Sequence, residues 1–479
     1  MTITKGIILR RTAEILVQYL PPKYELTLFC SMTPAQRHLY RVLALYVQRH
    51  LLFGDGRGVL AYITLLRQLC NSPELVRSEA NLANRSAEPE MQTLGSAMDA
   101  LLERRLAHVP RPSSVPRIAA ESGKLAVLHE LLHSIRAHTS DRVVIASSYT
   151  QTLDLLQRYC SSQRFPFVRL DGRTKQDERM QLVHEFNSVD SVSDASEGSS
   201  AFVFLLSTKS GGLGLNLTGA NRLILFDSDW NPSTDQQAMA RIHRDGQRKP
   251  CYVYRMLLVG SMDEKIYQRQ VCKIGLSDSL MGNEVGQGDD AGSRDSFTQE
   301  DLTDIFALST NTACLTHDLL GCGCGGTGTP MARSAVSEPE VDPAPRAGFV
   351  AASAIREQNT ALKQRSQKLA AQLSDVRHYD FAHHANYFHD DPILRHAAER
   401  QLGQREHRYP SLLDKAAEFA EGKLSNELVT ILAEEPPAHQ LDMVRQLLSR
   451  TPDWGEQAPG GDLLYVFSKP PSSASIQPE

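Results

Sequence analysis

Residues 202–226 read FVFLLSTKSGGLGLNLTGANRLILF. Two short apolar runs stand at the ends of this stretch, and glycines and small hydroxyl residues lie between them. Solid apolar runs predict strands that are buried on both faces, as in a parallel sheet. Glycines and hydroxyls after a strand let backbone N–H groups approach an anionic oxygen, but a plain turn has the same composition.

The same alternation of apolar strands and helices extends in both directions from this stretch. We expect further strands at residues 142–147, 167–170 and 252–258, and helices at 124–137, from 152, at 175–186, from 232 and after Ser261. Strands and helices in alternation predict an α/β lobe, with a parallel sheet that carries helices on both faces. Before it, the capping box from Thr33 to Gln36 opens a helix to about residue 52, and a second helix covers about 59–70.

Composition shifts divide the 479 residues into four parts. We expect a hinge and helical insertion at 1–120, the α/β lobe at 121–280 and a linker at 281–300. An extension follows at 301–479, with amphipathic helices at about 350–450 and a closing strand-like run at 463–467.

Charge is distributed unevenly along the chain. The whole chain has a formal net charge of -5, whereas residues 1–280 hold 34 Lys and Arg against 27 Asp and Glu, a net charge of +7. A mildly basic front half is compatible with a phosphate-binding face. No apolar run reaches the ~18 residues that a membrane span needs. The eight cysteines are scattered, mostly inside apolar runs, which is typical of a reduced intracellular protein.

Two arginines follow the second strand of the opening stretch. Residues 237–248 read QAMARIHRDGQR, and Arg241 and Arg244 are three positions apart, so we expect them on one helical face. Two guanidinium groups on one face are suited to a phosphate chain. The alternative is a structural role, in which one arginine pairs with Asp227, Asp229 or Asp245.

The order of these segments carries a family resemblance. The glycine-rich turn, DSDWNP at 227–232 and QAMARIHRDGQR resemble the last two helicase motifs of Snf/Swi-type superfamily-two motors. Similar matches occur at 8–11, 20–23, 66–73, 147–153 and 169–172. NLTGANR at 216–222 and THDLLGC at 316–322 resemble the Rad-fifty-four branch of recombination-repair translocases, although His243 stands where that branch commonly has tryptophan.

The resemblance implies a RecA-like helicase C-terminal lobe that acts as the second motor lobe of an ATP-dependent double-stranded DNA translocase. The family's phosphate loop and DExx box would lie in a first lobe ahead of residue 1, so this chain alone is expected to be inactive and its parent a DNA-dependent ATPase. ATP and magnesium would be bound through that first lobe. The implied partners are duplex DNA, a RecA-like recombinase filament and nucleosomes, in homologous recombination in the nucleus.

Two other functions stay open. One is a non-catalytic DNA- or partner-binding protein made of lobe two alone, and the other is a general chromatin remodeller. By the motif match, the catalytic residues are Arg241 and Arg244, and Gly212, Gly214 and Gln237 join them at ATP. The same match implies DNA contacts from Ser147, Gly172, Arg173, Ser207, Thr208 and Lys209.

A cluster of soft ligands lies in the extension. Cys314, His317, Cys322 and Cys324 fall within eleven positions, and four such ligands hold zinc tetrahedrally in structural sites. We expect His317, Cys322 and Cys324 as ligands, with the fourth supplied by His383, His384 or His389. The alternative is a glycine-rich loop that contains free thiols, because Cys322-Gly-Cys324 is tighter than the usual CxxC spacing.

Overall fold

The computed structural model describes residues 19–53, 59–77, 119, 121–188, 201–209, 214–281, 299–310, 312–328, 365–381, 386, 388–403, 425–428, 430–431, 443, 447, 463–469 and 471. The strands are β1 (Lys23–Cys30), β2 (Val143–Ser147), β3 (Phe167–Leu170), β4 (Val203–Ser207), β5 (Arg222–Leu225), β6 (Cys251–Leu258), β7 (Arg377–Asp380) and β8 (Leu463–Lys469). The helices used below are α1 (Pro34–Phe53), α2 (Val59–Asn71), α3 (Glu74–Arg77), α7 (Gly123–His138), α8 (Thr150–Ser162), α9 (Gln176–Asn187), α10 (Pro232–Ile242), α11 (Met262–Met281), α12 (Gln299–Phe306), α13 (Leu315–Leu320) and α16 (Pro392–Gly403).

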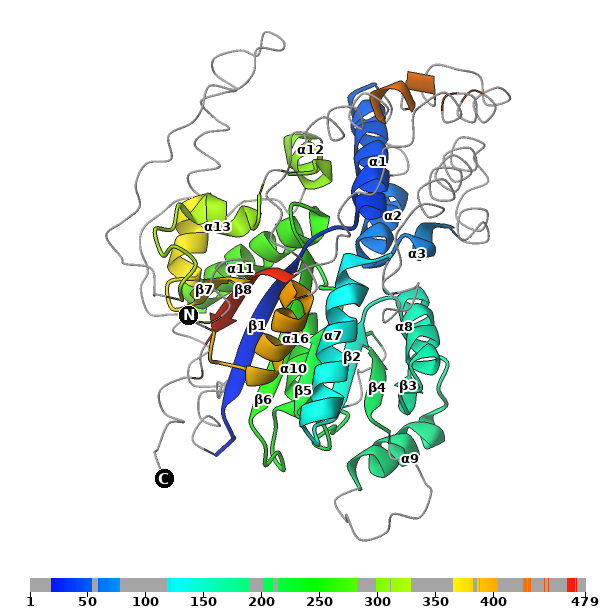
Figure 1. Cartoon of the computed structure of the whole chain (residues 1–479), viewed down its shortest axis with the longest axis vertical. Coiled ribbons are helices and arrows are strands. Elements are labelled where there is room, and N and C mark those ends of the chain that lie inside the picture. Colours follow the sequence, from blue (N-terminus) through cyan, green and yellow to red (C-terminus); the bar gives the residue numbers. More distant parts are fainter. Residues whose placement is uncertain are drawn as a thin grey trace, which may run out of the picture.

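Within the described residues, all eight strands join one sheet in the order β3-β4-β2-β5-β6-β1-β8-β7 (Figure 1). The first six are parallel, which confirms the α/β lobe with a parallel sheet. The last two are antiparallel and come from the extension: β8 pairs with β1, and β7 pairs with β8. The sheet is therefore mixed, and the expected closing strand at 463–467 is confirmed as part of β8.

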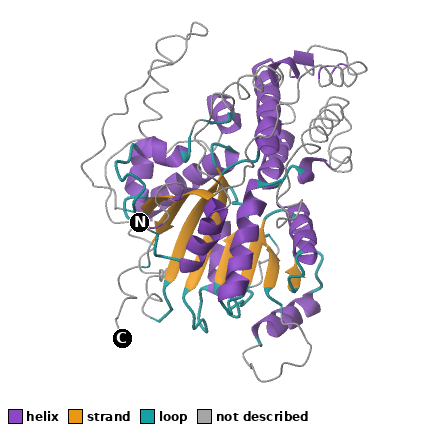
Figure 2. Ribbon diagram, in the orientation of Figure 1, coloured by secondary structure: helices purple, strands orange, loops and turns teal. Residues whose placement is uncertain are grey.

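Helices cover both faces of the sheet (Figure 2). Successive side chains of a strand point to opposite faces. On β2, Val143 and Ile145 pack into the core that α7, α8 and α16 cover, while Val144 and Ala146 pack into the core beneath α9 and α10. The helix α16 lies beside α7 in front of the sheet, so the extension is built onto the same layer as the lobe (Figure 1).

The helical insertion stands at one end of the sheet (Figure 1). Its first helix begins as the capping box predicts, because the backbone N–H of Gln36 donates to Thr33 Oγ1 at 3.2 Å and the backbone N–H of Thr33 donates to Gln36 Oε1 at 3.3 Å. Apolar residues of α1 and α2 share one core with α12 and the start of α11. Among the helices within the described ranges, none combines the length and apolar character that crossing a bilayer requires.

Candidate functional site

Four parallel strands end side by side and define the carboxyl edge of the sheet, which comprises the ends of β3, β4, β2 and β5 with the residues that follow each. Ligand sites of open α/β sheets lie at such an edge. The residues next to these strand ends are Asp171, Ser207, Ser147 and Asp227. All four are at least nine-tenths buried, so they shape the edge from beneath.

Asp227 connects the loops after β2 and β4. Its carboxylate accepts hydrogen bonds from the Ser147 hydroxyl, from the Ser148 backbone N–H at 2.8 Å and from Asn71 Nδ2 at 3.2 Å. Ser148 Oγ in turn lies 3.0 Å from Thr208 Oγ1. One buried carboxylate thus fixes the relative position of the two loops.

The structure divides the six residues expected at DNA into two groups. Ser147 and Ser207 are 0% and 3% exposed, and the Ser147 hydroxyl donates a hydrogen bond to Asp227. The geometry therefore disfavours a direct contact between these two side chains and a phosphate. Arg173 and Lys209 are exposed. Gly172 is exposed and Thr208 is half-buried.

A buried aspartate shapes the turn that carries Arg173. The backbone N–H of Arg173 donates to Asp171 Oδ1 at 2.8 Å, and Arg169 pairs with Asp171 Oδ2 at 2.7 Å. Burial raises the pKa of Asp171, but these two interactions outweigh it and hold the pKa below its usual value. The ionised carboxylate keeps the turn in place, with Gly172 and Arg173 outward.

Tyr149 is a half-buried residue of this edge that the sequence motifs did not mark as functional. The Lys209 Nζ lies 5.6 Å from the centroid of its ring, and the Arg67 guanidinium carbon lies 4.9 Å from it. Cations over an aromatic face are attracted by the ring quadrupole. Burial raises the pKa of Tyr149 to about 12, so the ring is neutral and orients Lys209 without pairing its charge.

The two candidate catalytic arginines lie at the end of α10. Asn231 caps the helix, since its side chain accepts from the backbone N–H of Ser233, and Pro232 occupies the first turn. The helix ends at Ile242, so the prediction that Arg241 and Arg244 share one helical face is wrong: the chain turns before Arg244. Burial, and after it the charge of Arg244, lower the pKa of Arg241.

Arg244 contacts the described end of the glycine-rich segment. Its Nη1 donates to the carbonyl oxygens of Gly214 and Leu215 at 3.1 and 3.2 Å. Gly214 has a φ of 31°, a left-handed conformation that glycine adopts most easily. Gly212 lies outside the described residues, and Gln237 is exposed on α10. Arg244 is therefore a link between the glycine-rich turn and the basic motif.

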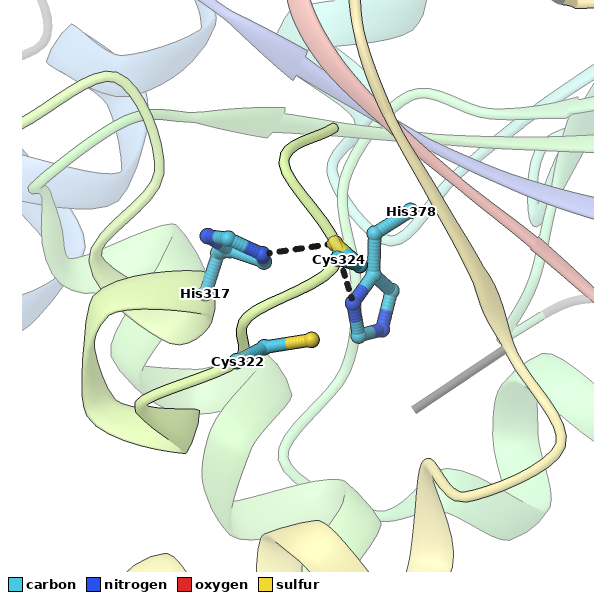
Figure 3. Close-up of side chains that lie close together, drawn as sticks. All are labelled: His317, Cys322, Cys324 and His378. Carbon is cyan, nitrogen blue, oxygen red and sulfur yellow. Dashed lines mark hydrogen bonds between the residues drawn. The ribbon is translucent and has the colours of Figure 1, made fainter. Parts of the chain in front are cut away.

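The extension brings four soft ligands together (Figure 3). The ligand atoms of His317, Cys322, Cys324 and His378 all lie within 4.8 Å of one another. His317 Nε2 is 3.2 Å from Cys324 Sγ, and His378 Nδ1 is 3.9 Å from it (Figure 3). His317, Cys322 and Cys324 are the three ligands that the sequence predicts.

The fourth ligand differs from the prediction. His378 on β7 takes that place, whereas His389 is exposed elsewhere and His383 and His384 lie outside the described residues. His378 was missed because β7 reaches the cluster only by pairing with β8, which no local pattern reveals. Cys314 is not part of the cluster: it caps α13, and its thiol donates to Glu264 Oε1 at 3.7 Å.

The electrostatics of the cluster favour a thiolate. Burial raises the pKa of Cys324, but hydrogen bonds from His317 and His378 outweigh it and lower the pKa to about 5. Burial raises the pKa of Cys322 to about 11. Two imidazoles and two thiols, one of them readily ionised, are a donor set that zinc prefers. The residues present therefore fit a structural zinc ion.

Two family models match the chain. Residues 123–246 match the helicase conserved C-terminal domain, and residues 1–75 match the SNF2-related domain. Among solved structures, the C-terminal part of the Fun30 ATPase domain is similar with a TM-score of 0.41 and 24% identity, over 60% of this chain and 97% of that one.

Curated proteins are also similar to this chain in sequence. DNA repair and recombination protein RDH54 of Saccharomyces cerevisiae (strain YJM789) is 41% identical over 328 residues, which is 68% of this chain and 32% of the relative. DNA repair and recombination protein RAD54-like of Drosophila pseudoobscura pseudoobscura is 38% identical over 320 residues, which is 66% of this chain and 38% of the relative. The chain spans about a third of the length of these curated relatives. With its SNF2-related and helicase C-terminal domains and its similarity to these relatives, the chain belongs to the SNF2-type superfamily-two proteins and is of the Rad54 type.

Proposed function

We propose that this chain is the second motor lobe of an ATP-dependent double-stranded DNA translocase that acts in DNA repair by homologous recombination. The observation that carries the proposal is the carboxyl edge of the sheet. There, exposed Arg173 and Lys209 stand on loops fixed by Asp171 and Asp227, and Arg244 ties the glycine-rich turn to the basic motif. Relatives named as DNA repair and recombination proteins support the process.

DNA would be held through its phosphates. Arg173 and Lys209 offer charge, and Gly172 and Thr208 offer small side chains that let the backbone come close. Contacts of this kind are independent of base sequence and weaken with salt. Ser147 acts from beneath through its hydrogen bond to Asp227, and Ser207 is buried beside it at the end of β4.

ATP would lie between this lobe and a first lobe, which supplies the phosphate loop and the magnesium site. Arg241 and Arg244 would face the γ-phosphate, where a guanidinium stabilises the charge of the transition state. Gln237 and Gly214, with Gly212, would border the nucleotide. The hydrogen bonds from Arg244 to the carbonyls of Gly214 and Leu215 support this proposal, because they connect the arginine to the turn that would border the nucleotide.

The extension would contribute a structural zinc site. When bound, zinc would cross-link α13 to β7 through His317, Cys322, Cys324 and His378, and would supply no catalysis. A recombinase filament is the proposed protein partner, nucleosomes are a second one, and the nucleus is the proposed location.

Salt dependence of duplex binding tests the DNA contact on this chain. We expect weak binding without sequence preference. Because each phosphate contact contributes about -0.9 to the slope of log affinity against log salt, Arg173→Ala or Lys209→Ala should reduce the slope by about 1. Lys249→Ala is the matched control, since Lys249 is exposed just before β6, at the amino ends of the parallel strands and thus opposite the carboxyl edge. Binding that is unaffected by salt, or equal slopes for all variants, would contradict the proposal.

A further inference from the structure

Asn71 ends α2 of the helical insertion and is completely buried against the lobe. Its Nδ2 donates to Thr152 Oγ1 at 3.0 Å and to Asp227 Oδ2 at 3.2 Å. Its Oδ1 accepts from Lys124 Nζ at 3.2 Å, and its backbone carbonyl accepts from the Ser122 hydroxyl at 2.7 Å. One side chain thus joins the insertion to α7, α8 and the carboxyl edge of the sheet.

Lys124 fixes which way the Asn71 amide points. The ammonium of Lys124 has only donors, so it must face the amide oxygen, and the amide nitrogen is then left to face Asp227 and Thr152. Lys124 is itself held, because it is 0% exposed, pairs with Asp263 at 2.5 Å and donates to the carbonyl of Phe226 at 3.0 Å. The amide donor is therefore presented to Asp227 in one orientation.

The path from Asn71 to the DNA contacts has three steps. Asp227, which accepts from Asn71, also accepts from Ser147 and Ser148 in the loop after β2. Ser148 then contacts Thr208, the neighbour of Lys209, in the loop after β4. A second connection runs alongside, since Arg67 on α2 donates to the carbonyl of Ser228.

We propose that Asn71 is a positioning residue through which the helical insertion sets the DNA-contacting loops of the carboxyl edge. This inference rests on the proposed function, because it assigns Asn71 a role in the duplex binding proposed there. The amide is suited to the role, because it donates to the carboxylate of Asp227 and accepts from Lys124 without adding a charge to the buried site. A shift of α2 relative to the lobe then moves Asp227 and the loop after β2, and the Ser148–Thr208 contact passes the change to the loop that carries Lys209.

The test uses this chain with a fluorescent duplex at low salt. Asn71→Asp keeps the shape and the acceptor for Lys124 but places a second carboxylate beside Asp227. We expect it to weaken duplex binding about tenfold, within the coupling range of contacting residues. Adding Asp227→Asn restores one donor and one carboxylate, so the double variant should recover to within about threefold of the unaltered chain.

Two further variants separate positioning from stability. Asp391→Ala removes a buried carboxylate far from the carboxyl edge, so it should lower the melting temperature and leave duplex affinity unchanged. Asn71→Ala introduces no charge and serves if the carboxylate variant fails to fold; it too should weaken binding by severalfold.

The outcomes are distinct. If the unaltered chain does not bind duplex DNA, the proposed function fails and this inference fails with it. If the unaltered chain binds and both Asn71 variants, folded, bind equally well, the inference alone is overturned. Loss of binding by Asn71→Asp that the Asp227→Asn change does not recover, while Asn71→Ala binds normally, would also overturn it.

Discussion

Removal of the Asp391 carboxylate is expected to destabilise the lobe, although Asp391 belongs to the extension. Asp391 is 0% exposed and begins the turn before α16. Its side chain accepts from Arg222 Nη1 at 3.2 Å, from the Tyr254 hydroxyl and from the backbone N–H of Ile393 at 3.1 Å. Arg222 and Tyr254 lie on β5 and β6, so this one carboxylate fastens α16 to the sheet.

The magnitude follows from what Asp391→Ala leaves behind. Removing one partner of a buried ion pair typically costs about 3–5 kcal/mol, because the other charge stays buried. Arg222 keeps Asp141 at 2.7 Å, which lowers this part of the cost. The Tyr254 hydroxyl then lacks its acceptor, at about 1–3 kcal/mol, and the helix loses a cap, at about 1 kcal/mol. Because these terms overlap, we expect a total of about 4 kcal/mol.

Urea unfolding followed by circular dichroism measures this change. The neighbouring Asp390 offers a matched control, since it pairs at 3.8 Å with Arg377, whose side chain is 44% exposed, and accepts from the Ser468 hydroxyl at 2.5 Å. Asp390→Ala should cost less than Asp391→Ala, about 1–2 kcal/mol, because it leaves one buried hydroxyl without its acceptor but no buried charge. A loss below about 1 kcal/mol for Asp391→Ala would refute the inference that this carboxylate fastens α16 to the sheet.

The remaining predictions concern the metal cluster and acid stability. Protein purified without chelator should contain about one zinc per chain. Cys324→Ser should lose the zinc, whereas Cys314→Ser should keep it, because the Cys314 thiol donates to Glu264 and is not part of the cluster. Metal analysis that finds no zinc in folded protein would refute the site. Burial raises the pKa of Asp141, but the hydrogen bond and charge of Arg222 outweigh it and hold the pKa below its ordinary value of 3.8. The stability that Asp141 contributes is thus present above that value and is lost as the pH falls through the lowered pKa, so the unfolding free energy of Asp141→Asn should fall less between pH 5 and pH 3 than that of the unaltered chain. Equal losses would contradict this assignment.

Local patterns predicted the central part of the fold well. The solid apolar runs at 142–147 and 202–206 form β2 and β4, because strands buried on both faces need continuous apolar sequence. The capping box at Thr33 and the proline after it fix the start of α1 through bonds within four residues. Signals of this kind depend on neighbours in sequence, so the sequence contains them.

Long-range pairing was harder to foresee. The segment 23–30 follows two prolines and was assigned to a hinge, yet it forms β1, between β6 and β8. Its second partner comes from residues 463–469, more than four hundred positions later. The same pairing brings β7 and His378 to the metal cluster, so the fourth ligand was missed for the same physical reason.

The sequence predicted which residues belong to the candidate site better than it predicted how they are arranged. The motifs named Ser147 and Asp227, but burial gives both a bracing role beneath the exposed cations. The expected helical spacing of Arg241 and Arg244 failed because α10 stops at Ile242. Tyr149 and Asn71 lay inside quoted motifs without an assigned role, since their contacts become visible only when α2 and the loop after β2 are placed together.

The central claim is that this lobe supplies arginines to ATP hydrolysis while separate residues hold the duplex. The most direct test measures DNA-stimulated ATP turnover and duplex affinity in one protein, with this chain joined to a first motor lobe. We expect Arg241→Ala and Arg244→Ala to lower turnover by about 10³-fold or more, with duplex affinity nearly unchanged. Arg244→Lys should also be impaired, because lysine keeps the charge but loses the planar fork. Near-normal turnover by Arg244→Lys would contradict the account for that residue, and a parallel loss of turnover and thermal stability in the alanine variants would show that the arginines only brace the loop.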